Sequence, residues 1–340
     1  MMYIRIYFIS IFVFFLLFSG CTQKNDFPVL KGPYLGQKPP GMKPEIFAPG
    51  IISTGYNERI ACFTVDGKEL YFMLWGAPVG VLLHMEEENG IWTKPEVVPF
   101  SGKYNGEYLL SPDGRKIVFC TDRPLSGKGK PLNNFYTWIV EKEGDAWGEP
   151  KYIEAFEDEE KSFSGYPTIA KSGNIYFYSE RKDGMGREDI YLSRFKNGNY
   201  SKPENLGFGV NTEHDEIDPF IAPDESYIIY LRRGDEGFGG VDLFISFKKE
   251  DGSWTEGKNM GPDINSSATE YCPSVSPDGR YFFFTSNRSI HKNYSDSPLS
   301  FKEKIKILNS PGNGLGDIYW VDAKIIESLK PEKYGLNSKK

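Results

Sequence analysis

The sequence predicts an all-β protein, a five-bladed β-propeller of four-stranded antiparallel sheets, with six blades as the alternative. Three observations support this fold class: the composition, one segment that recurs at nearly constant spacing, and a turn motif that is followed each time by a strand. The chain of 340 residues contains 36 Gly and 23 Pro, and 15% of its residues are aromatic. This composition favours many short strands and turns over bundles of helices.

The first recurring segment has the pattern Gly-x-aromatic-x-x-Pro. The copies lie at 90–95, 145–150 (after Gly144), 198–203 and 252–257, where Gly replaces Pro, and a degenerate copy lies at 41–44. Their last residues are 51, 55, 53 and 54 residues apart. A spacing this regular indicates one structural unit that is repeated along the chain.

Two further segments complete each unit. Ser-Pro-Asp-Gly followed by a run of aromatic and β-branched residues occurs at 111–119 and 276–284, and weaker turn copies lie at 64–67, 170–173 and 222–225. Pro and Gly supply the backbone angles of a tight turn, and Asp binds its own backbone there, so this segment predicts two strands joined by a turn. A third segment, Asp-Ile-Tyr or close to it, begins at 189, 242 and 317 and predicts another strand.

Each unit therefore holds four short strands, a sheet too small to cover both of its faces. Arranging such sheets around one axis buries those faces, which is the propeller solution. The repeat begins with an outer-strand segment at 44–50 and ends after a third-strand segment at 317–321. We therefore expect the N-terminal strand to complete the last blade, with the propeller at 40–325 and a C-terminal tail at 326–340.

Residues 1–20 are predicted to be a signal peptide. Arg5 is the only charged residue before Lys24, and the almost wholly apolar run at 6–18 is short for a spanning helix. The run ends at Phe18-Ser19-Gly20-Cys21, which resembles the lipobox of bacterial lipoproteins, although Leu is commoner than Phe at the first position.

The lipobox resemblance implies cleavage before Cys21 and acylation of its thiol, for example by palmitate, and of the new amino group. Residues 21–39 would then include the acylated cysteine and an extended tether. An uncleaved N-terminal anchor helix is the alternative. Both interpretations place the rest of the chain outside the cytoplasm and attached to a membrane.

The repeat itself resembles a known family. The Ser-Pro-Asp-Gly turn, the Asp-Ile-Tyr strand, and the segments Thr121-Asp122-Arg123, Ser179-Glu180-Arg181 and Ser286-Asn287-Arg288 are similar to the TolB-like, WD-repeat-like propeller repeats of bacterial envelope proteins. The first unit departs from the pattern, with Trp75-Gly76-Ala77-Pro78 in place of the arginine segment. The resemblance covers residues 40–325 and implies a fold more specifically than a function. It also fits an outer-membrane lipoprotein of a Gram-negative bacterium.

Several functional classes are disfavoured. The formal net charge of −7 argues against a nucleic-acid partner, which requires a basic face. Without Cys21, the remaining Cys62, Cys120 and Cys272 form at most one disulfide, and the chain has no Cys-x-x-Cys. The three histidines are scattered, and no Gly-x-Ser-x-Gly elbow is present, so we expect no metal and no cofactor.

The repeated arginines and aspartates are interpreted as structural. Arg123, Arg181, Arg232 or Arg233, and Arg288 follow the second strands, and Asp189, Asp242 and Asp317 begin the third. One Arg and one Asp in each repeat fit an ion pair inside the blade or a cap on loop carbonyls.

The candidate ligand site is a ring of acids at the start of the inner strands. The residues six positions before each turn are Glu58, Asn105, Ser164, Glu216 and Glu270, while Glu107 and Asp218 lie two positions further along. Inner strands of a propeller converge on its axis, so Glu58, Glu107, Glu216, Asp218 and Glu270 are predicted to share one rim. Such a ring favours a cation or basic peptide, and crowded carboxylates raise one another's pKa values. The alternative is a solvated rim in which each Glu binds backbone of the next blade.

Two functional hypotheses remain. The first is a monomeric, non-enzymatic module that binds a protein, peptide or glycan in the cell envelope and is attached to the membrane through its lipid. The second is a carbohydrate-active hydrolase or lyase that uses two of the rim carboxylates. The long insert at 289–316 is interpreted equally as a functional loop or as a lid on the rim.

Overall fold

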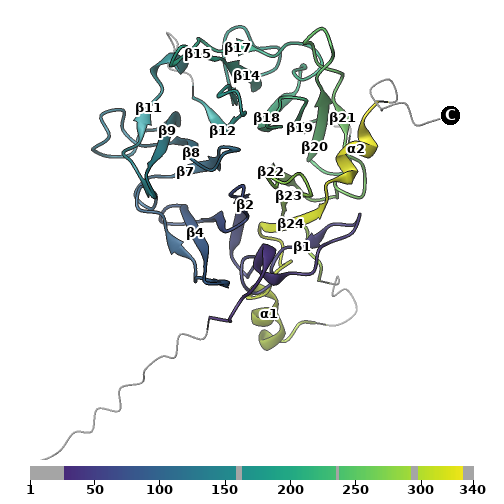
Figure 1. Cartoon of the computed structure of the whole chain (residues 1–340). Coiled ribbons are helices and arrows are strands. Elements are labelled where there is room, and N and C mark those ends of the chain that lie inside the picture. The colour runs from purple at the N-terminus through teal and green to yellow at the C-terminus, as the bar shows by residue number, and fades with distance from the viewer. Residues whose placement is uncertain (1–26, 158–162, 235–236, 292–297, 332–340) are drawn as a thin grey trace, which may run out of the picture.

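The computed structural model describes residues 27–157, 163–234, 237–291 and 298–331. Within these ranges five small antiparallel sheets surround one axis, so the predicted five-bladed propeller is confirmed (Figure 1). The predicted signal peptide and Cys21 lie outside the described residues. In the part of the chain that is described, no helix has the length and apolar character needed to cross a bilayer.

Each blade has an inner, a second, a third and an outer strand, and the first three blades carry additional short strands. Blade 1 consists of β2 (Asn57–Phe63), β3 (Glu69–Trp75) and β4 (Val81–Glu88), with β5 (Ile91–Trp92) and β6 (Glu96–Val97) both paired to β4. Blade 2 consists of β7 (Gly106–Leu110), β8 (Lys116–Thr121) and β9 (Tyr136–Glu143), with β10 (Ala146–Trp147) and β11 (Lys151–Tyr152) both paired to β9. Blade 3 consists of β12 (Gly165–Ile169), β13 (Ile175–Ser179), β14 (Asp189–Ser193) and β17 (Glu204–Asn205), and the hairpin β15 (Phe195–Lys196) and β16 (Asn199–Tyr200) extends from it.

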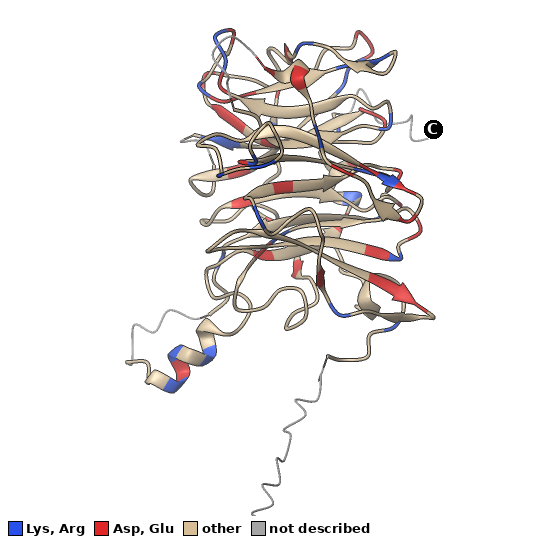
Figure 2. Ribbon diagram, turned by 90° about the vertical axis from the view of Figure 1, so that its left-hand side faces the viewer, with Lys and Arg blue, Asp and Glu red and all other residues tan. Residues whose placement is uncertain are grey.

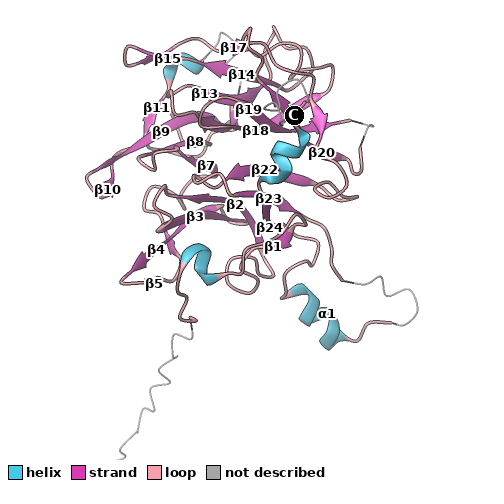
Figure 3. Ribbon diagram, turned by 45° about the vertical axis from the view of Figure 1, so that its right-hand side comes forward, coloured by secondary structure: helices cyan, strands magenta, loops and turns pink. Residues whose placement is uncertain are grey.

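The last two blades have four strands each. Blade 4 consists of β18 (Asp215–Ile221), β19 (Tyr227–Arg233), β20 (Val241–Phe247) and β21 (Lys258–Asn259). Blade 5 consists of β22 (Glu270–Val275), β23 (Tyr281–Ser286), β24 (Asp317–Asp322) and β1 (Glu45–Ile46). The helices are short: η1 (Pro33–Gly36), η2 (Glu154–Phe156), α1 (Phe301–Leu308) and α2 (Lys324–Leu329) (Figure 3).

The N-terminal strand closes the ring, as the phase of the repeat predicts. Strand β1 pairs antiparallel with β24, with Glu45 opposite Trp320 and Ile46 opposite Tyr319. The Phe47 amide extends the pairing by donating to the carbonyl of Ile318 at 2.8 Å. The first and last parts of the chain therefore form one blade, which joins the ends of the propeller without a covalent bond.

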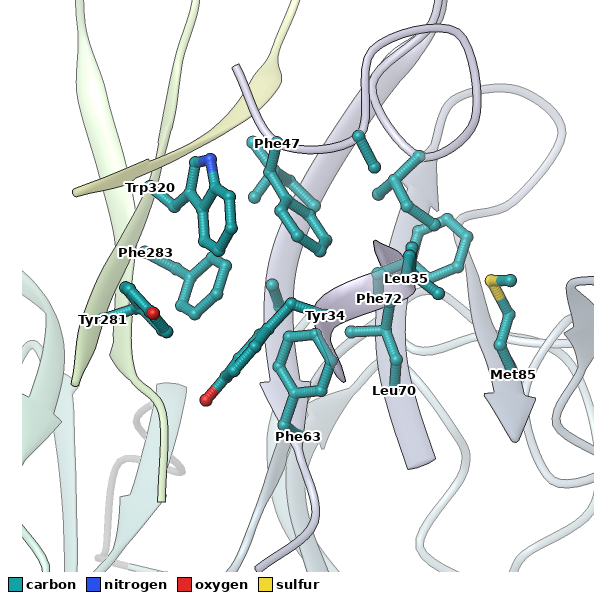
Figure 4. Close-up of a cluster of buried hydrophobic side chains, with 14 of the residues drawn as sticks. Tyr34, Leu35, Phe47, Phe63, Leu70, Phe72, Met85, Tyr281, Phe283 and Trp320 are labelled. Carbon is teal, nitrogen blue, oxygen red and sulfur yellow. The ribbon is translucent and has the colours of Figure 1, made fainter. Parts of the chain in front are cut away.

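Aromatic side chains fill the seam between blades 5 and 1. Phe47 is fully buried, and its ring centroid lies 5.0 Å from that of Trp320 and 5.3 Å from that of Phe283, both edge-on (Figure 4). Edge-to-face pairs of this kind stabilise a core beyond the area that they bury. The seam is therefore held by packing as well as by the two-residue strand β1.

The Ser-Pro-Asp-Gly segments form the turns that the sequence predicts. In blade 5, the Ser276 hydroxyl donates to Asp278 at 2.6 Å, and the Asp278 carboxylate accepts the Arg280 amide at 3.1 Å. Gly279 has a φ of 70°, a left-handed conformation that glycine adopts without steric cost. The turn thus sets the register between the inner and second strands.

The chain before β1 differs from the expected extended tether. Leu30, Tyr34 and Leu35 are buried in the core cluster at the seam, and the Tyr34 hydroxyl donates to Asp278 at 2.9 Å. The Trp92 indole donates to the carbonyl of Gly32 at 2.9 Å. Three apolar side chains in a short segment outweigh its Pro and Gly content, so residues 27–36 pack on the propeller.

The first residues of the segment expected to be a C-terminal tail pack on the propeller. Ile325 and Ile326 of α2 are buried against blades 4 and 5, so the packed chain extends through the described part of the segment that was expected to be a tail. Cys62, Cys120 and Cys272 are free thiols.

Candidate functional site

Three of the five predicted rim acids are enclosed by their own loops. Glu58, Glu216 and Glu270 stand at the starts of β2, β18 and β22 and are at most 2% exposed. Each carboxylate accepts the backbone amide and the hydroxyl of the residue four positions earlier: Thr54 at 3.1 and 2.5 Å, Thr212 at 2.9 and 2.5 Å, and Ser266 at 2.9 and 2.7 Å. The pattern [Ser/Thr]-x-x-x-Glu therefore forms a latch that fixes the loop entering each inner strand.

The repeated arginines complete these latches. Arg232 donates to Glu216 at 2.8 Å and Arg288 donates to Glu270 at 3.0 Å. Each arginine of the repeat also binds a backbone carbonyl of the loop before its own blade; the four pairs are Arg123 with Phe100, Arg181 with Phe156, Arg232 with Val210, and Arg288 with Ile264. These arginines therefore cap loop carbonyls, which is one of the two structural roles that the sequence predicts.

The repeated aspartates accept hydrogen bonds from backbone amides, whereas the arginines donate to backbone carbonyls. Asp189 accepts the amides of Met185 and Gly186, and Asp242 accepts those of Phe238 and Gly239. Asp317 likewise accepts the amide of Gly312 at 2.7 Å. These aspartates cap N–H groups of the loop before the third strand, while the arginines cap loop carbonyls, which is the second of the two predicted alternatives.

Burial changes the pKa values of acids in the latches. Desolvation raises the pKa values of Glu58 and Glu216, although the hydrogen bonds from Thr54 and Thr212 oppose the effect. A carboxylate that already accepts these bonds has little capacity left for a ligand. We conclude that these acids position loops, and their participation in a ligand-binding rim stays a prediction.

The other two rim acids, Glu107 and Asp218, extend toward the axis and form an axial cluster with Arg59. Arg59 of β2 binds Glu107 of β7 at 3.0 Å, and its guanidinium lies 4.3 Å from the ring centroid of Trp75. Asp218 of β18 is 8% exposed, and the Cys272 thiol lies 3.9 Å from its carboxylate. The cluster joins blades 1, 2, 4 and 5.

A β-bulge in the inner strand directs Asp218 to the axis. Asp218 has a φ of 49°, and the pairing of β18 with β19 shifts by one residue between Ile217 and Phe220. Ile60, Tyr166 and Cys272 have positive φ values at the same repeat position. A bulge re-aims a side chain out of the regular alternation, so alternation along the strand alone did not predict this orientation.

The surroundings of Asp218 favour the neutral form of its carboxyl group. Burial raises its pKa, the negative charge of Glu107 raises it further, and Arg59 opposes them, with a result of about 8. A neutral carboxyl of this kind is able to donate a proton. Its enclosure, however, limits the access of any substrate.

The turn end of the axis is closed to ligands. The cavity there has a volume of about 50 Å³ and is lined by the inner strands of all five blades, including Cys62, Leu110, Ile169 and Val275. Known ligand sites have volumes of roughly 300–1,000 Å³. Side chains therefore fill the axis at this end. Within the described ranges, no three His, Cys, Asp or Glu side chains are grouped as metal ligands.

A larger hollow lies between the outer strands of blades 1 and 2, and we call it the interblade cleft. Its volume is about 760 Å³, within the range of ligand sites. Blade 1 contributes Glu69, His84 and the segment 96–101, and blade 2 contributes Lys142 and the segment 145–150. Trp147 and Phe100 form an aromatic wall, with their ring centroids 6.0 Å apart at an angle of 81°.

The charged groups of the cleft are pre-positioned. Glu69 accepts hydrogen bonds from Lys142 at 2.7 Å, from Tyr71 at 2.7 Å and from His84 at 3.0 Å. Burial alone raises the pKa of Glu69, but these three donors outweigh it and lower the pKa to about 2. Fixed polar groups beside an aromatic wall are the usual composition of a binding site.

The recurring Gly-x-aromatic segment, which indicates the repeat unit, also contains a signal for this cleft. Trp92, Trp147 and Trp254 occupy the same position of the recurring Gly-x-aromatic segment. Trp92 and Trp254 are buried, whereas Trp147 is half-buried and lines the cleft. Which copy keeps its ring accessible depends on packing between blades, so the sequence alone did not distinguish them.

Comparison with known proteins gives no family assignment. No protein-family model and no curated protein matches the chain. Similar solved structures include an alpha-L-arabinofuranosidase from Lactobacillus brevis, with 14% identity, a TM-score of 0.47, and coverage of 79% of this chain and 91% of that one.

Two TolB structures are also similar. A putative TolB from Agrobacterium tumefaciens has 17% identity and a TM-score of 0.46, and the match covers 78% of this chain and 90% of that one. TolB from Acinetobacter baumannii has 14% identity and a TM-score of 0.45, with 78% of this chain matched, and the match spans 54% of that protein's length.

Proposed function

We propose that the chain is a non-enzymatic binding protein of the bacterial cell envelope that holds a protein, peptide or glycan partner in the interblade cleft. Acylation at Cys21 attaches it to the outer membrane as a monomer. The interblade cleft carries the proposal, because it combines a volume of about 760 Å³ with an accessible aromatic wall and fixed charges.

The hydrogen bonding of the acids favours binding over catalysis. Glu58, Glu216 and Glu270 are enclosed in latches, and Glu107 is paired with Arg59. Hydrolysis of a glycoside typically needs two carboxyl groups that both reach the substrate. Among the five predicted acids, Asp218 alone has neither a latch nor an ion pair in the described residues, so no second uncommitted carboxyl of this set stands beside it.

The cleft has the chemistry for an extended polar partner. Trp147 provides a face for a sugar ring or for a proline or aromatic side chain, and exposed Lys103 and half-buried Arg123 provide donors for carbonyl or carboxylate oxygens. Glu69 is already saturated by three donors, so it orients Lys142 and His84 rather than binding the partner directly.

Affinity purification of the tagged chain from its native envelope tests the proposal. Trp147→Ala removes a large aromatic anchor, and truncating such an anchor typically costs about 2 kcal/mol, or roughly thirtyfold in affinity. Tyr200→Ala is the matched control, because Tyr200 has the same repeat position and is also half-buried but lies in blade 3. We expect Trp147→Ala to lose the partner and Tyr200→Ala to keep it; equal recovery from both variants contradicts binding in the cleft.

The alternative hydrolase or lyase activity has one supporting observation, the pKa of about 8 at Asp218. If Asp218 is a general acid, Asp218→Asn abolishes turnover of envelope glycans and leaves partner recovery unchanged. Turnover that depends on Asp218, together with failure to recover any partner, replaces the binding proposal by the enzymatic one.

A further inference from the structure

Helix α1 (Phe301–Leu308) leaves its apolar face uncovered. None of its eight residues is buried, and the exposed fractions of Phe301, Ile305 and Leu308 are 83%, 40% and 43%. These residues are spaced i, i+4 and i+7, so they lie on one side of the helix. Helices in globular proteins normally gain most of their stability by packing such a face, and α1 does not.

Hydrogen bonds at its two ends stabilise the helix instead. At the N-terminal end, Ser300 and Glu303 form a capping box, in which each side chain binds the other's backbone amide. At the C-terminal end, the Asn313 amide donates to the carbonyls of Leu308 at 2.9 Å and Gly55 at 3.0 Å. This arrangement fixes α1 to the loop that enters blade 1, while its apolar side chains stay exposed.

Lys302 and Lys304 border the apolar side, and Lys306 lies further round the helix. Lys302, Lys304 and Lys306 are all exposed, and Glu303 is the only acid of the helix, bound in the capping box (Figure 2). A short helix with an apolar stripe and flanking lysines fits the interface of a bilayer that contains anionic lipids. The lysine stems extend along the apolar region while their ammonium groups reach the headgroups.

The position of α1 indicates the same surface. In all three views α1 and the start of the described chain lie at the same end of the propeller, and Figures 2 and 3 show them on opposite sides of that end (Figures 1, 2 and 3). Ahead of Phe27 lie the apolar run at 6–18 and Cys21. A lipid on Cys21 leaves residues 22–26 as the spacer, which spans at most roughly 18 Å. The edge that carries α1 is thus kept near the bilayer.

We propose that α1 docks on an anionic lipid surface and inserts Phe301, Ile305 and Leu308 into its interface. The docking fixes the propeller edge-on, with its axis along the membrane and the interblade cleft open to the side. This inference rests on the membrane attachment in the proposed function but not on the occupant of the cleft.

Quenching of an introduced tryptophan tests the docking. The full chain is incorporated into phosphatidylcholine vesicles with brominated acyl chains, with and without phosphatidylglycerol. Phe301→Trp places the probe in the docking face, and Phe208→Trp is the matched control, since Phe208 is 85% exposed and lies in the segment between blades 3 and 4. Both variants add one tryptophan to the same native set, and near-ultraviolet circular dichroism checks their folding.

We expect the added emission of Phe301→Trp to be quenched in vesicles with phosphatidylglycerol and that of Phe208→Trp to persist. Equal quenching of the two probes, or none, while the chain floats with the vesicles overturns the docking but leaves the attachment intact. Failure of the chain to float contradicts the attachment and the docking together. Equally strong quenching of Phe301→Trp on phosphatidylcholine alone overturns the assignment to anionic lipid.

Discussion

Replacing Asp218 by Asn is expected to stabilise the protein at alkaline pH. Asn conserves the shape of the side chain and tolerates the left-handed backbone that Asp218 adopts, with its φ of 49°. The substitution removes one ionisable group from the axial cluster. Any pH-dependent difference between variant and wild type therefore reports on the Asp218 carboxyl.

The size of the effect follows from the pKa of Asp218, which rises from an ordinary 3.8 to about 8 because of burial and the charge of Glu107. A raised folded-state pKa means that stability is greatest below the unfolded-state value and falls as the pH rises from about 4 to about 8. At 1.36 kcal/mol for each pKa unit, the full loss is on the order of 6 kcal/mol. Between pH 5 and pH 9 the variant should gain on the order of 4 kcal/mol relative to wild type.

Urea unfolding of the variant and of the wild type at pH 5 and pH 9 measures how the difference in their unfolding free energies changes with pH. Asp224→Asn is the control, because it makes the same chemical change in an exposed turn, where the Asp224 carboxylate accepts the Ser226 amide. The reasoning is refuted if the stability difference between Asp218→Asn and wild type is the same at both pH values, or if it decreases at pH 9.

Two further substitutions test the latches and the seam. Arg288→Ala leaves the buried carboxylate of Glu270 without its cation, and loss of one partner of a buried pair costs about 3–5 kcal/mol; urea unfolding measures it, and a loss below 1 kcal/mol contradicts the structural role. Phe47→Ala removes a fully buried ring from the closing seam and is expected to cost about 3–5 kcal/mol in the same assay. Phe208→Ala is the exposed control for the second substitution, and equal destabilisation by both contradicts the importance of the seam.

The ring closure was predictable because it depends on which strand of the repeat comes first in the chain and which comes last. A chain that begins with an outer-strand segment and ends with a third strand leaves one unpaired edge at each end, and β1 pairing with β24 satisfies both. Turn positions were equally predictable. The Asp278 carboxylate accepts a backbone amide within the turn, and Gly279 adopts the left-handed backbone angle that the turn requires. Both depend on residues that are close together or regularly spaced in the sequence.

The candidate site was less predictable because it depends on what covers each side chain. Counting along the strands placed Glu216 and Asp218 at the correct strand start, but a hydroxyl four residues earlier encloses Glu216, and a bulge redirects Asp218 to the axis. The interblade cleft depends on Trp147 staying accessible, whereas residues of the N-terminal segment cover Trp92. These differences arise from contacts between distant segments, which repeat spacing does not encode.

Photo-crosslinking in the native envelope tests binding in the interblade cleft most directly. A photoreactive amino acid replaces Val97, which is 51% exposed and lines the cleft, or, in a parallel strain, Phe208 on the outer surface. We predict that irradiation yields one discrete adduct from position 97 and none from position 208. The same adduct from both positions, or adducts from position 208 alone, would contradict the assignment of the partner to the cleft.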